Sequence, residues 1–231
     1  LVLLFALLIV LTKFRWIHCS MIPGWCLVYR QLFPPTIAIV YGDEGMGDPQ
    51  TLKRMIVRNT GYYPMMYRLS GASLGILDKY SVIIVERARN MSDDQLLMFQ
   101  NLAARGKVLV WIGDAGAANE NGVEVGWKRK KVNFELVLMA EYKGTREGSY
   151  RVHIVDPMHP LVNGMSNFDF QGKYVSVTPK YAAVSIGATF GKNGPPVVFE
   201  RRYANLIFYY ALAPEEVSTV FVTNMIWHAL E

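Results

Sequence analysis

The sequence predicts an α/β domain built on a mostly parallel sheet, and three observations carry this prediction. Runs that are apolar at successive positions occur at 36–42, 81–86 and 107–113, as expected for strands covered on both faces. Helical patterns separate these runs, so strands and helices alternate along the chain and indicate βαβ units. No internal repeat interrupts this order, and residues 34–231 are therefore predicted to form one domain.

The two helices between these strands have recognisable ends. Asp48 and Pro49 make a favourable helix start, and this helix should stop near Gly61. A second helix should begin with a capping box formed by Ser92 and Gln95, and it should close at a glycine, Gly106. Its predicted buried stripe consists of Leu96, Phe99, Leu102 and Ala103.

The second half of the domain has a different pattern. Short alternating segments with glycines and prolines between them are typical of antiparallel or edge strands. They occupy 150–157, 173–179, 182–191 and 195–202. A strand-like run follows at 205–212, and the acidic residues after Pro214 predict the start of a final helix. Four residues of that helix are expected to face the core: Val217, Val220, Phe221 and Met225.

The N-terminal segment is more apolar than the rest of the chain. Neither 1–12, which contains no charge, nor 16–29 reaches by itself the roughly 18–20 apolar residues that span a bilayer. The first run begins at Leu1 rather than Met, so upstream residues could complete a span. A cleaved signal peptide is the alternative, but no basic segment precedes the run and no small-residue cleavage site follows it.

We therefore predict that residues 1–33 are a membrane anchor and juxtamembrane segment in contact with lipid. The protein would be single-pass or N-terminally anchored, with Trp16 and Trp25 at the membrane interface. The side of the membrane that holds the domain stays open.

The net charge of +5 is partly concentrated in this segment. Without Lys13, Arg15 and Arg30, 21 basic and 19 acidic residues remain, a balance that does not favour a nucleic-acid partner. The basic run WKRKK at 127–131 is interpreted as a solvated loop rather than a phosphate or lipid contact. Both cysteines lie within 1–33, so the domain is expected to have neither a cysteine nucleophile nor a cysteine zinc site.

Four motifs resemble the class I glutamine amidotransferase-like superfamily, in particular its trehalose-utilisation-type or uncharacterised branches. They are TIAIVYGDEG, the segment that ends in KVLVWIGDAG, VDPMHPLVNGM and the C-terminal run from NLIFYYAL. The resemblance implies a flavodoxin-like three-layer sandwich, with extra antiparallel strands in the second half. One fold hosts many activities, so function has to be argued from the site.

The resemblance also identifies a turn where catalytic members of the superfamily carry their nucleophile. Their motif reads G-x-C-x-G, and when it is aligned on Gly113 the cysteine position falls on Ala115. The later H-x-E pattern is missing after both His153 and His228. Without a thiolate and a paired base, no catalytic residue is predicted, and the amidotransferase reaction is not expected.

Other residues could still bind a ligand. Asp43, Glu44 and Asp114 follow predicted strands, and ligands of open α/β sheets bind at the carboxyl ends of strands. Such carboxylates could serve as acid and base or hold a hard cation, but capping of loops and helices is the simpler interpretation. His159 lies in a loop that packs near the elbow in the resembling families. It could therefore face a ligand, or it could only bond the backbone of its own turn.

The ligand-binding candidates are therefore Asp43, Glu44, Asp114 and His159, with no metal site. The glycine-rich stretch around Asp43 fits neither the Rossmann nor the P-loop pattern, and no cofactor is predicted.

The leading functional hypothesis rests on two observations, the predicted membrane anchor and the missing nucleophile. It describes a membrane-anchored, catalytically inactive amidotransferase-like domain that serves as an accessory or scaffold subunit of a membrane or cell-envelope protein complex. Two alternatives remain open: a carbohydrate- or small-ligand-binding domain, and a metal-assisted hydrolase that uses the strand-end carboxylates.

Overall fold

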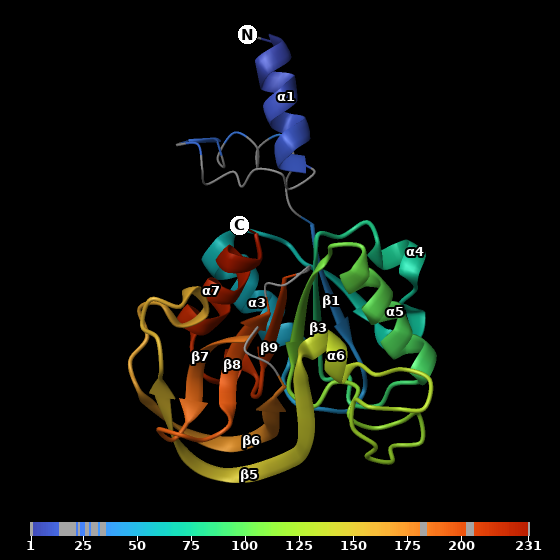
Figure 1. Ribbon diagram of the computed structural model, residues 1–231, viewed down its shortest axis with the longest axis vertical. Coiled ribbons are helices and arrows are strands. Elements are labelled where there is room, and N and C mark those ends of the chain that lie inside the picture. The colour runs from blue at the N-terminus through green and yellow to red at the C-terminus, as the bar shows by residue number, and fades with distance from the viewer. Residues whose placement is uncertain are drawn as a thin grey trace.

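The computed structural model describes residues 2–13, 22, 24, 25, 28, 32, 36–180, 184–201 and 206–230. Its centre is a nine-stranded sheet in the order β2-β1-β3-β4-β9-β8-β7-β5-β6 (Figure 1). The strands are β1 Ile37–Tyr41, β2 Met65–Arg68, β3 Val82–Glu86, β4 Val108–Ile112, β5 Ala140–Ile154, β6 Phe168–Pro179, β7 Val184–Phe190, β8 Pro196–Arg201 and β9 Ile207–Tyr210. The sheet is mixed, with a parallel core and antiparallel additions, as the sequence predicts.

The parallel core consists of β2, β1, β3, β4 and β9. Residues 37–40, 82–86 and 108–112 are buried throughout, which explains why these runs are apolar on both strand faces. The order also creates a switch point, since β2 lies on one side of β1 and β3 lies on the other. Crevices that bind ligands in such sheets lie beyond the strand ends at this point.

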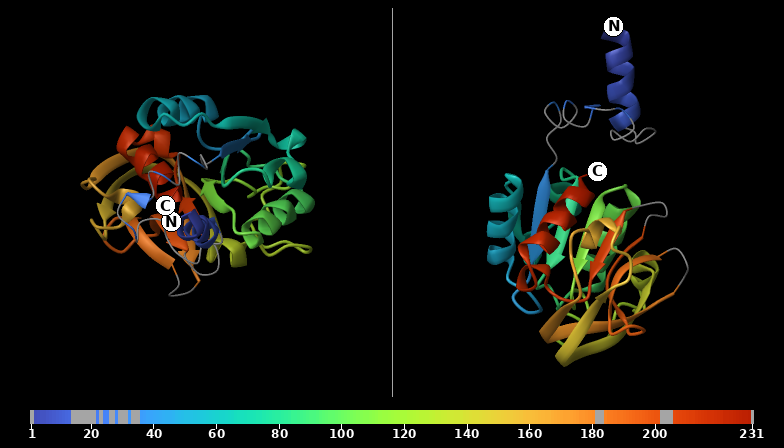
Figure 2. Two further views of the ribbon diagram at one scale, coloured as in Figure 1. Left: turned by 90° about the horizontal axis from the view of Figure 1, so that it is seen from above. Right: turned by 90° about the vertical axis from the view of Figure 1, so that its left-hand side faces the viewer.

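Helices cover both faces of the parallel strands (Figures 1 and 2). α3 (Pro49–Thr60) and α7 (Thr219–Ala229) pack together on one face, while α4 (Leu74–Leu77) and α5 (Asp93–Ala104) pack on the other. The short helix α6 (Glu135–Leu138) lies beside α5. Three short 3-10 turns are also described: η2 Leu69–Gly71, η3 Pro160–Val162 and η4 Pro214–Glu216.

The predicted ends of α3 and α5 are confirmed. Asp48 accepts a hydrogen bond from the amide of Gln50, and Gly61 ends α3 with a φ of 74°. Ser92 and Gln95 form the complete capping box of α5. The buried side of α5 consists of the four residues predicted for it: Leu96, Phe99, Leu102 and Ala103.

The last helix begins later than predicted. Pro214–Glu216 form the turn η4, and α7 starts only at Thr219, where Ser218 accepts a hydrogen bond from the amide of Phe221. The buried face of α7 includes Val222 and Ile226 in place of Val220. Phe221 is buried as expected, whereas Val220 is 42% exposed.

A long antiparallel ribbon of β5 and β6 lies beside the carboxyl end of β9. Figure 1 shows this ribbon curving along the bottom of the view, below β8 and β9. β5 and β6 pair with each other, beginning with Ala140 opposite Pro179. The end of β5 also pairs with β7, where Val152 lies opposite Phe190. The amide of Val175 in β6 donates to the carbonyl of Ala211 just after β9, at 2.8 Å. The ribbon therefore lies against the end of β9, whereas the ends of β1 and β2 at the switch point stay accessible.

The N-terminal segment contains α1, Val2–Lys13, which is 12 residues long. A helix of that length rises about 18 Å, less than the roughly 30 Å of a bilayer core. Among the residues that the structure describes, no helix is long and apolar enough to cross a membrane. This finding contradicts the membrane localisation predicted from residues 1–33.

The described part of this segment also corrects one detail of the predicted membrane interface. Trp25 is 6% exposed and donates its indole N–H to the hydroxyl of Thr12 at 2.8 Å. Its ring meets Phe5 edge to face at 5.4 Å. Trp25 thus packs against α1, while Trp16 lies outside the described residues.

Candidate functional site

The elbow after β4 is a tight glycine turn, as its sequence predicts. Gly113 has a φ of 59°, and its amide donates to the carbonyl of Tyr210 at 2.7 Å. A Cβ atom at this position would lie 3.0 Å from the Cβ of Met46, so the loop after β1 packs directly on the turn. A side chain at residue 113 would therefore suffer both backbone strain and a clash.

The position aligned with the catalytic cysteine is filled and closed. Ala115 is fully buried, and its carbonyl accepts hydrogen bonds from two indoles, Trp111 at 2.9 Å and Trp127 at 2.8 Å. Trp127 is itself fully buried and meets the rings of Tyr142 and Tyr209 at 5.2 and 5.4 Å. The carbonyl of Ala115 is therefore fixed by the protein and covered by aromatic side chains.

Asp114 serves as a tie between two loops. Its side chain is 7% exposed, and one carboxylate oxygen accepts a hydrogen bond from the amide of Met46 at 3.0 Å. The other oxygen lies 3.6 Å from the guanidinium of Arg89. Burial raises the pKa of Asp114, although the Met46 amide and Arg89 both favour the charged carboxylate. These contacts agree with the interpretation that Asp114 caps a loop.

Asp43 and Glu44 lie at the same edge but point to solvent. Asp43 is 3.6 Å from Arg68, and both side chains are mostly exposed. Glu44 accepts a hydrogen bond from the side-chain NH2 group of Asn90 at 3.2 Å. The cap prediction for Asp48 is confirmed by its bond to Gln50 at 3.0 Å.

A hollow of about 210 Å³ opens beside Asp43 at the ends of β1 and β2. Tyr41, Arg68 and Arg87 contribute to its wall together with the start of α3. Arg87 has a φ of 50°, a conformation that non-glycine residues rarely adopt. The hollow thus combines two arginines, two carboxylates (Asp43 and Asp48) and an aromatic ring at the switch point of the sheet.

His159 belongs to a different part of the molecule. Its Nδ1 accepts a hydrogen bond from the amide of Leu161 at 3.3 Å, which confirms that it ties its own turn. Its Nε2 is 4.0 Å from the carboxylate of Glu200, which also contacts His228. Burial lowers the pKa of His159, while Glu200 acts in the opposite direction. The structure therefore brings Asp43, Glu44 and Asp114 to one edge and places His159 against β8 and α7.

The described residues contain no group of three or more His, Cys, Asp or Glu side chains arranged to hold a metal ion. Asp114 contacts Met46 and Arg89, whereas Asp43 faces Arg68. These contacts separate the carboxylates that the metal-assisted hydrolase hypothesis requires to converge.

Sequence reasoning missed a buried pair of carboxyl groups at the same edge. Glu86, the last residue of β3, is fully buried, and Glu215 of η4 is 6% exposed. Neither carboxyl oxygen of Glu86 meets a hydrogen-bond donor among the described residues, and Glu215 accepts one hydrogen bond from the amide of Asp48 at 2.8 Å. The two carboxyls can bond to each other only if one of them is protonated. Burial, followed by the charge of Glu215, raises the pKa of Glu86 well above its ordinary value, and burial also raises the pKa of Glu215.

Glu86→Gln should stabilise the domain at neutral pH. A carboxyl whose pKa is raised by folding stabilises the folded state fully below its ordinary value of 4.5, and the contribution is lost as the pH rises through the raised value. A glutamine amide can donate to Glu215 at any pH, so this loss should shrink. Urea unfolding from about pH 4.5 to about pH 8 should give a free energy of unfolding that falls with pH in the wild type and changes less in the variant.

Glu135→Gln is the matched control for this experiment. Glu135 is also buried, at 5% exposed, but its carboxylate accepts a hydrogen bond from Lys180. Its replacement should lower the free energy of unfolding at neutral pH because an ion pair is lost. Equal destabilisation by both substitutions would show that Glu86 and Glu215 do not share a proton.

Comparison with known proteins identifies the fold. No protein-family model and no curated protein matches the sequence. Among solved structures, a ThuA-like protein from Bacteroides uniformis matches with a TM-score of 0.61 and 14% identity, over 85% of this chain and 91% of that chain. The chain has the fold of ThuA-like proteins. This agrees with the amidotransferase-like superfamily that the motifs resemble, and at such low identity the likeness extends to the fold alone.

Two further matches bear on the architecture of the ThuA-like fold. A protein of Salmonella typhimurium, described as cytoplasmic, matches with a TM-score of 0.62 and 15% identity, over 84% of this chain and 98% of that chain. The β-galactosidase of Bacillus circulans sp. alkalophilus matches with a TM-score of 0.64 and 13% identity over 84% of this chain. This chain spans only 30% of that enzyme's length.

Proposed function

We propose that this protein is a catalytically inactive, amidotransferase-like domain that acts as an accessory subunit by binding another protein. The observation that carries the proposal is the closed elbow. Ala115 lies at the position that aligns with the cysteine of the superfamily. The indoles of Trp111 and Trp127 both donate hydrogen bonds to the carbonyl of Ala115. No thiol, and no hydroxyl of the elbow itself, is available to attack a substrate there.

Two other features support an accessory role. The β5–β6 ribbon bonds to Ala211 at the end of β9, and its Tyr142 packs against Trp127 beside the elbow. In the β-galactosidase of Bacillus circulans the matched part is 30% of a longer chain, so the same fold there forms one part of a larger protein.

The closure of the elbow can be tested with the thiol introduced by Ala115→Cys. The substitution is made in the full chain after Cys19→Ser and Cys26→Ser remove the natural thiols, and the reaction with a thiol reagent is timed. Ala104→Cys, on the exposed side of α5, is the matched control. We expect labelling at 115 to be at least ~100-fold slower, because local opening of about 3 kcal/mol must precede it.

Equal labelling rates, in proteins with unchanged circular dichroism, would mean that the elbow is open. A direct assay for hydrolysis of glutamine and of activated esters completes the test. We expect no turnover by the wild-type chain. Turnover that disappears in Asp114→Asn, a variant that can still accept the Met46 hydrogen bond, would overturn the proposal.

A second candidate function is small-ligand binding in the hollow beside Asp43. Its two arginines, two carboxylates and Tyr41 suit a polyhydroxylated ligand, because such residues bind hydroxyl groups and stack on sugar rings. Thermal unfolding with trehalose and with galactose tests this candidate. Stabilisation that is lost in Arg87→Met would support it, and no shift with either sugar would argue against it.

A further inference from the structure

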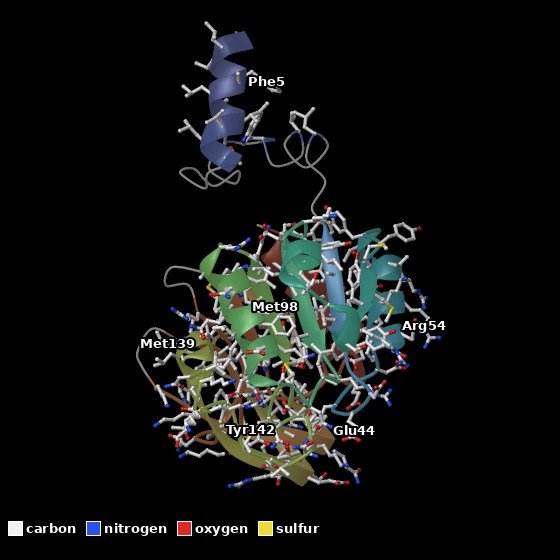
Figure 3. All side chains as sticks on the ribbon, turned by 90° about the vertical axis from the view of Figure 1, so that its right-hand side faces the viewer. Phe5, Glu44, Arg54, Met98, Met139 and Tyr142 are labelled. Atoms are coloured by element: carbon white, nitrogen blue, oxygen red, sulfur yellow. The ribbon has the colours of Figure 1, made fainter. Side chains whose placement is uncertain are left out.

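A second, larger hollow lies on the opposite face from α3 and α7, between α5 and the segment that contains α6. Its volume is about 320 Å³. Figure 3 looks on this side of the molecule, where Met98 of α5 and Met139, directly after α6, are labelled. The hollow involves none of the four predicted ligand residues.

Part of the apolar lining of this hollow is exposed to solvent. Leu97 on α5 is 42% exposed and Leu136 on α6 is 50% exposed, and both line it. Val132 and Val137 form a buried apolar floor. Leucines exposed on both sides of an open hollow are typical of a surface that another protein covers, whereas small-molecule sites enclose most of their ligand.

The charges of the hollow are all positive. Lys131 and Arg201 line it, together with the amide side chains of Gln100 and Asn133, and no Asp or Glu does. Arg201 donates to the carbonyls of Leu136 and Val137 at 3.1 and 2.7 Å.

Among the residues that the structure describes, no carboxylate forms an ion pair with Arg201, and its Nε is buried without a hydrogen-bond partner. A guanidinium that is partly removed from water and has only neutral partners favours the approach of a carboxylate.

We propose that this hollow docks a short acidic segment of a partner protein. A bulky apolar side chain of that segment packs between Leu97 and Leu136, and a neighbouring Asp or Glu pairs with Lys131 and Arg201. This inference deepens the proposed accessory function and rests on it, because it assigns the surface through which a partner binds.

The test uses the full chain and a library of random 12-residue peptides displayed on phage. Enriched peptides should combine Asp or Glu with Leu, Ile, Phe or Met within a few positions. The most enriched peptide is then synthesised and its affinity is measured by fluorescence anisotropy. Lys131→Glu and Leu97→Asp should each weaken binding by ~10-fold or more. Arg201 is left intact because it also holds the end of α6.

Two exposed residues away from the hollow provide matched controls. Lys192→Glu and Val123→Asp make the same changes of charge and polarity, and neither residue lines the hollow. Both variants should bind the peptide as the wild type does. Enrichment of no peptide, enrichment of peptides without acidic residues, or equal losses in the control variants would overturn the docking proposal.

A competition experiment with octanoate tests whether the hollow binds a peptide or a free small acid of similar chemistry. If octanoate displaces the peptide at equal concentration, the hollow is a small-acid site and the docking proposal is wrong. The outcomes are distinct from those of the elbow test. Hydrolysis dependent on Asp114 would refute the inactive-subunit proposal even if acidic peptides bind, and failure of peptide binding would leave the closed elbow unaffected.

Discussion

Replacing Arg129 with methionine should lower the free energy of unfolding by about 3–5 kcal/mol. The Arg129 guanidinium donates to the carbonyls of Met91, Gly116 and Ala118 at 2.6 to 2.7 Å. Its side chain is only 5% exposed, so these carbonyls would lose a charged donor in a place that water does not easily reach. Urea unfolding at neutral pH measures the effect.

Lys130→Met is the matched control for Arg129→Met. Lys130 belongs to the same basic run but is exposed, so its replacement should change the free energy of unfolding by less than about 0.5 kcal/mol. Similar small effects at both positions would show that Arg129 does not hold the elbow loops together.

Trp127→Ala should have a comparable effect on stability and should also open the elbow. Truncation of a fully buried tryptophan costs about 3–5 kcal/mol through lost packing. Trp127→Phe keeps a ring between Tyr142 and Tyr209 but loses the bond to the carbonyl of Ala115, so its cost should be smaller, roughly 1–3 kcal/mol. Thermal and urea unfolding provide the measurements.

The same pair of variants separates packing from closure. The thiol introduced by Ala115→Cys should react faster in the Trp127→Ala background than in the Trp127→Phe background, because only alanine removes the covering ring. Equal reactivity in the two backgrounds would mean that Trp127 stabilises the loop without closing the elbow.

Much of the fold could be predicted because its signals are local. β1, β3 and β4 are apolar on both faces, and α5 carries a complete capping box. β2 was missed because it is a half-exposed edge strand, and its residues Met65–Arg68 show no clear alternation. The start of α7 was misplaced because Pro214 and two glutamates look like a helix start, although Glu215 in fact accepts a hydrogen bond from Asp48.

The candidate site was less predictable because its contacts join distant parts of the chain. Asp114 was found through its place after a strand, but its partner Met46 is 68 residues away. Glu86 and Glu215 give no sequence signal of their pairing. The run WKRKK predicts a solvated loop, and this prediction is wrong for Trp127 and Arg129, which are buried. A tryptophan within a basic run was the one local sign that part of it is buried.

The position of β9 in the sheet has a consequence for synthesis of the protein on the ribosome. β9 lies between β4 and β8, yet Leu109 of β4 pairs with Ile207, almost a hundred residues later in the chain. A nascent chain that has emerged only to residue 200 has β4 as an open edge, with buried-type side chains and unpaired backbone groups. Such an edge pairs readily with other strands. We therefore expect the chain to be most prone to aggregation during translation of its antiparallel half.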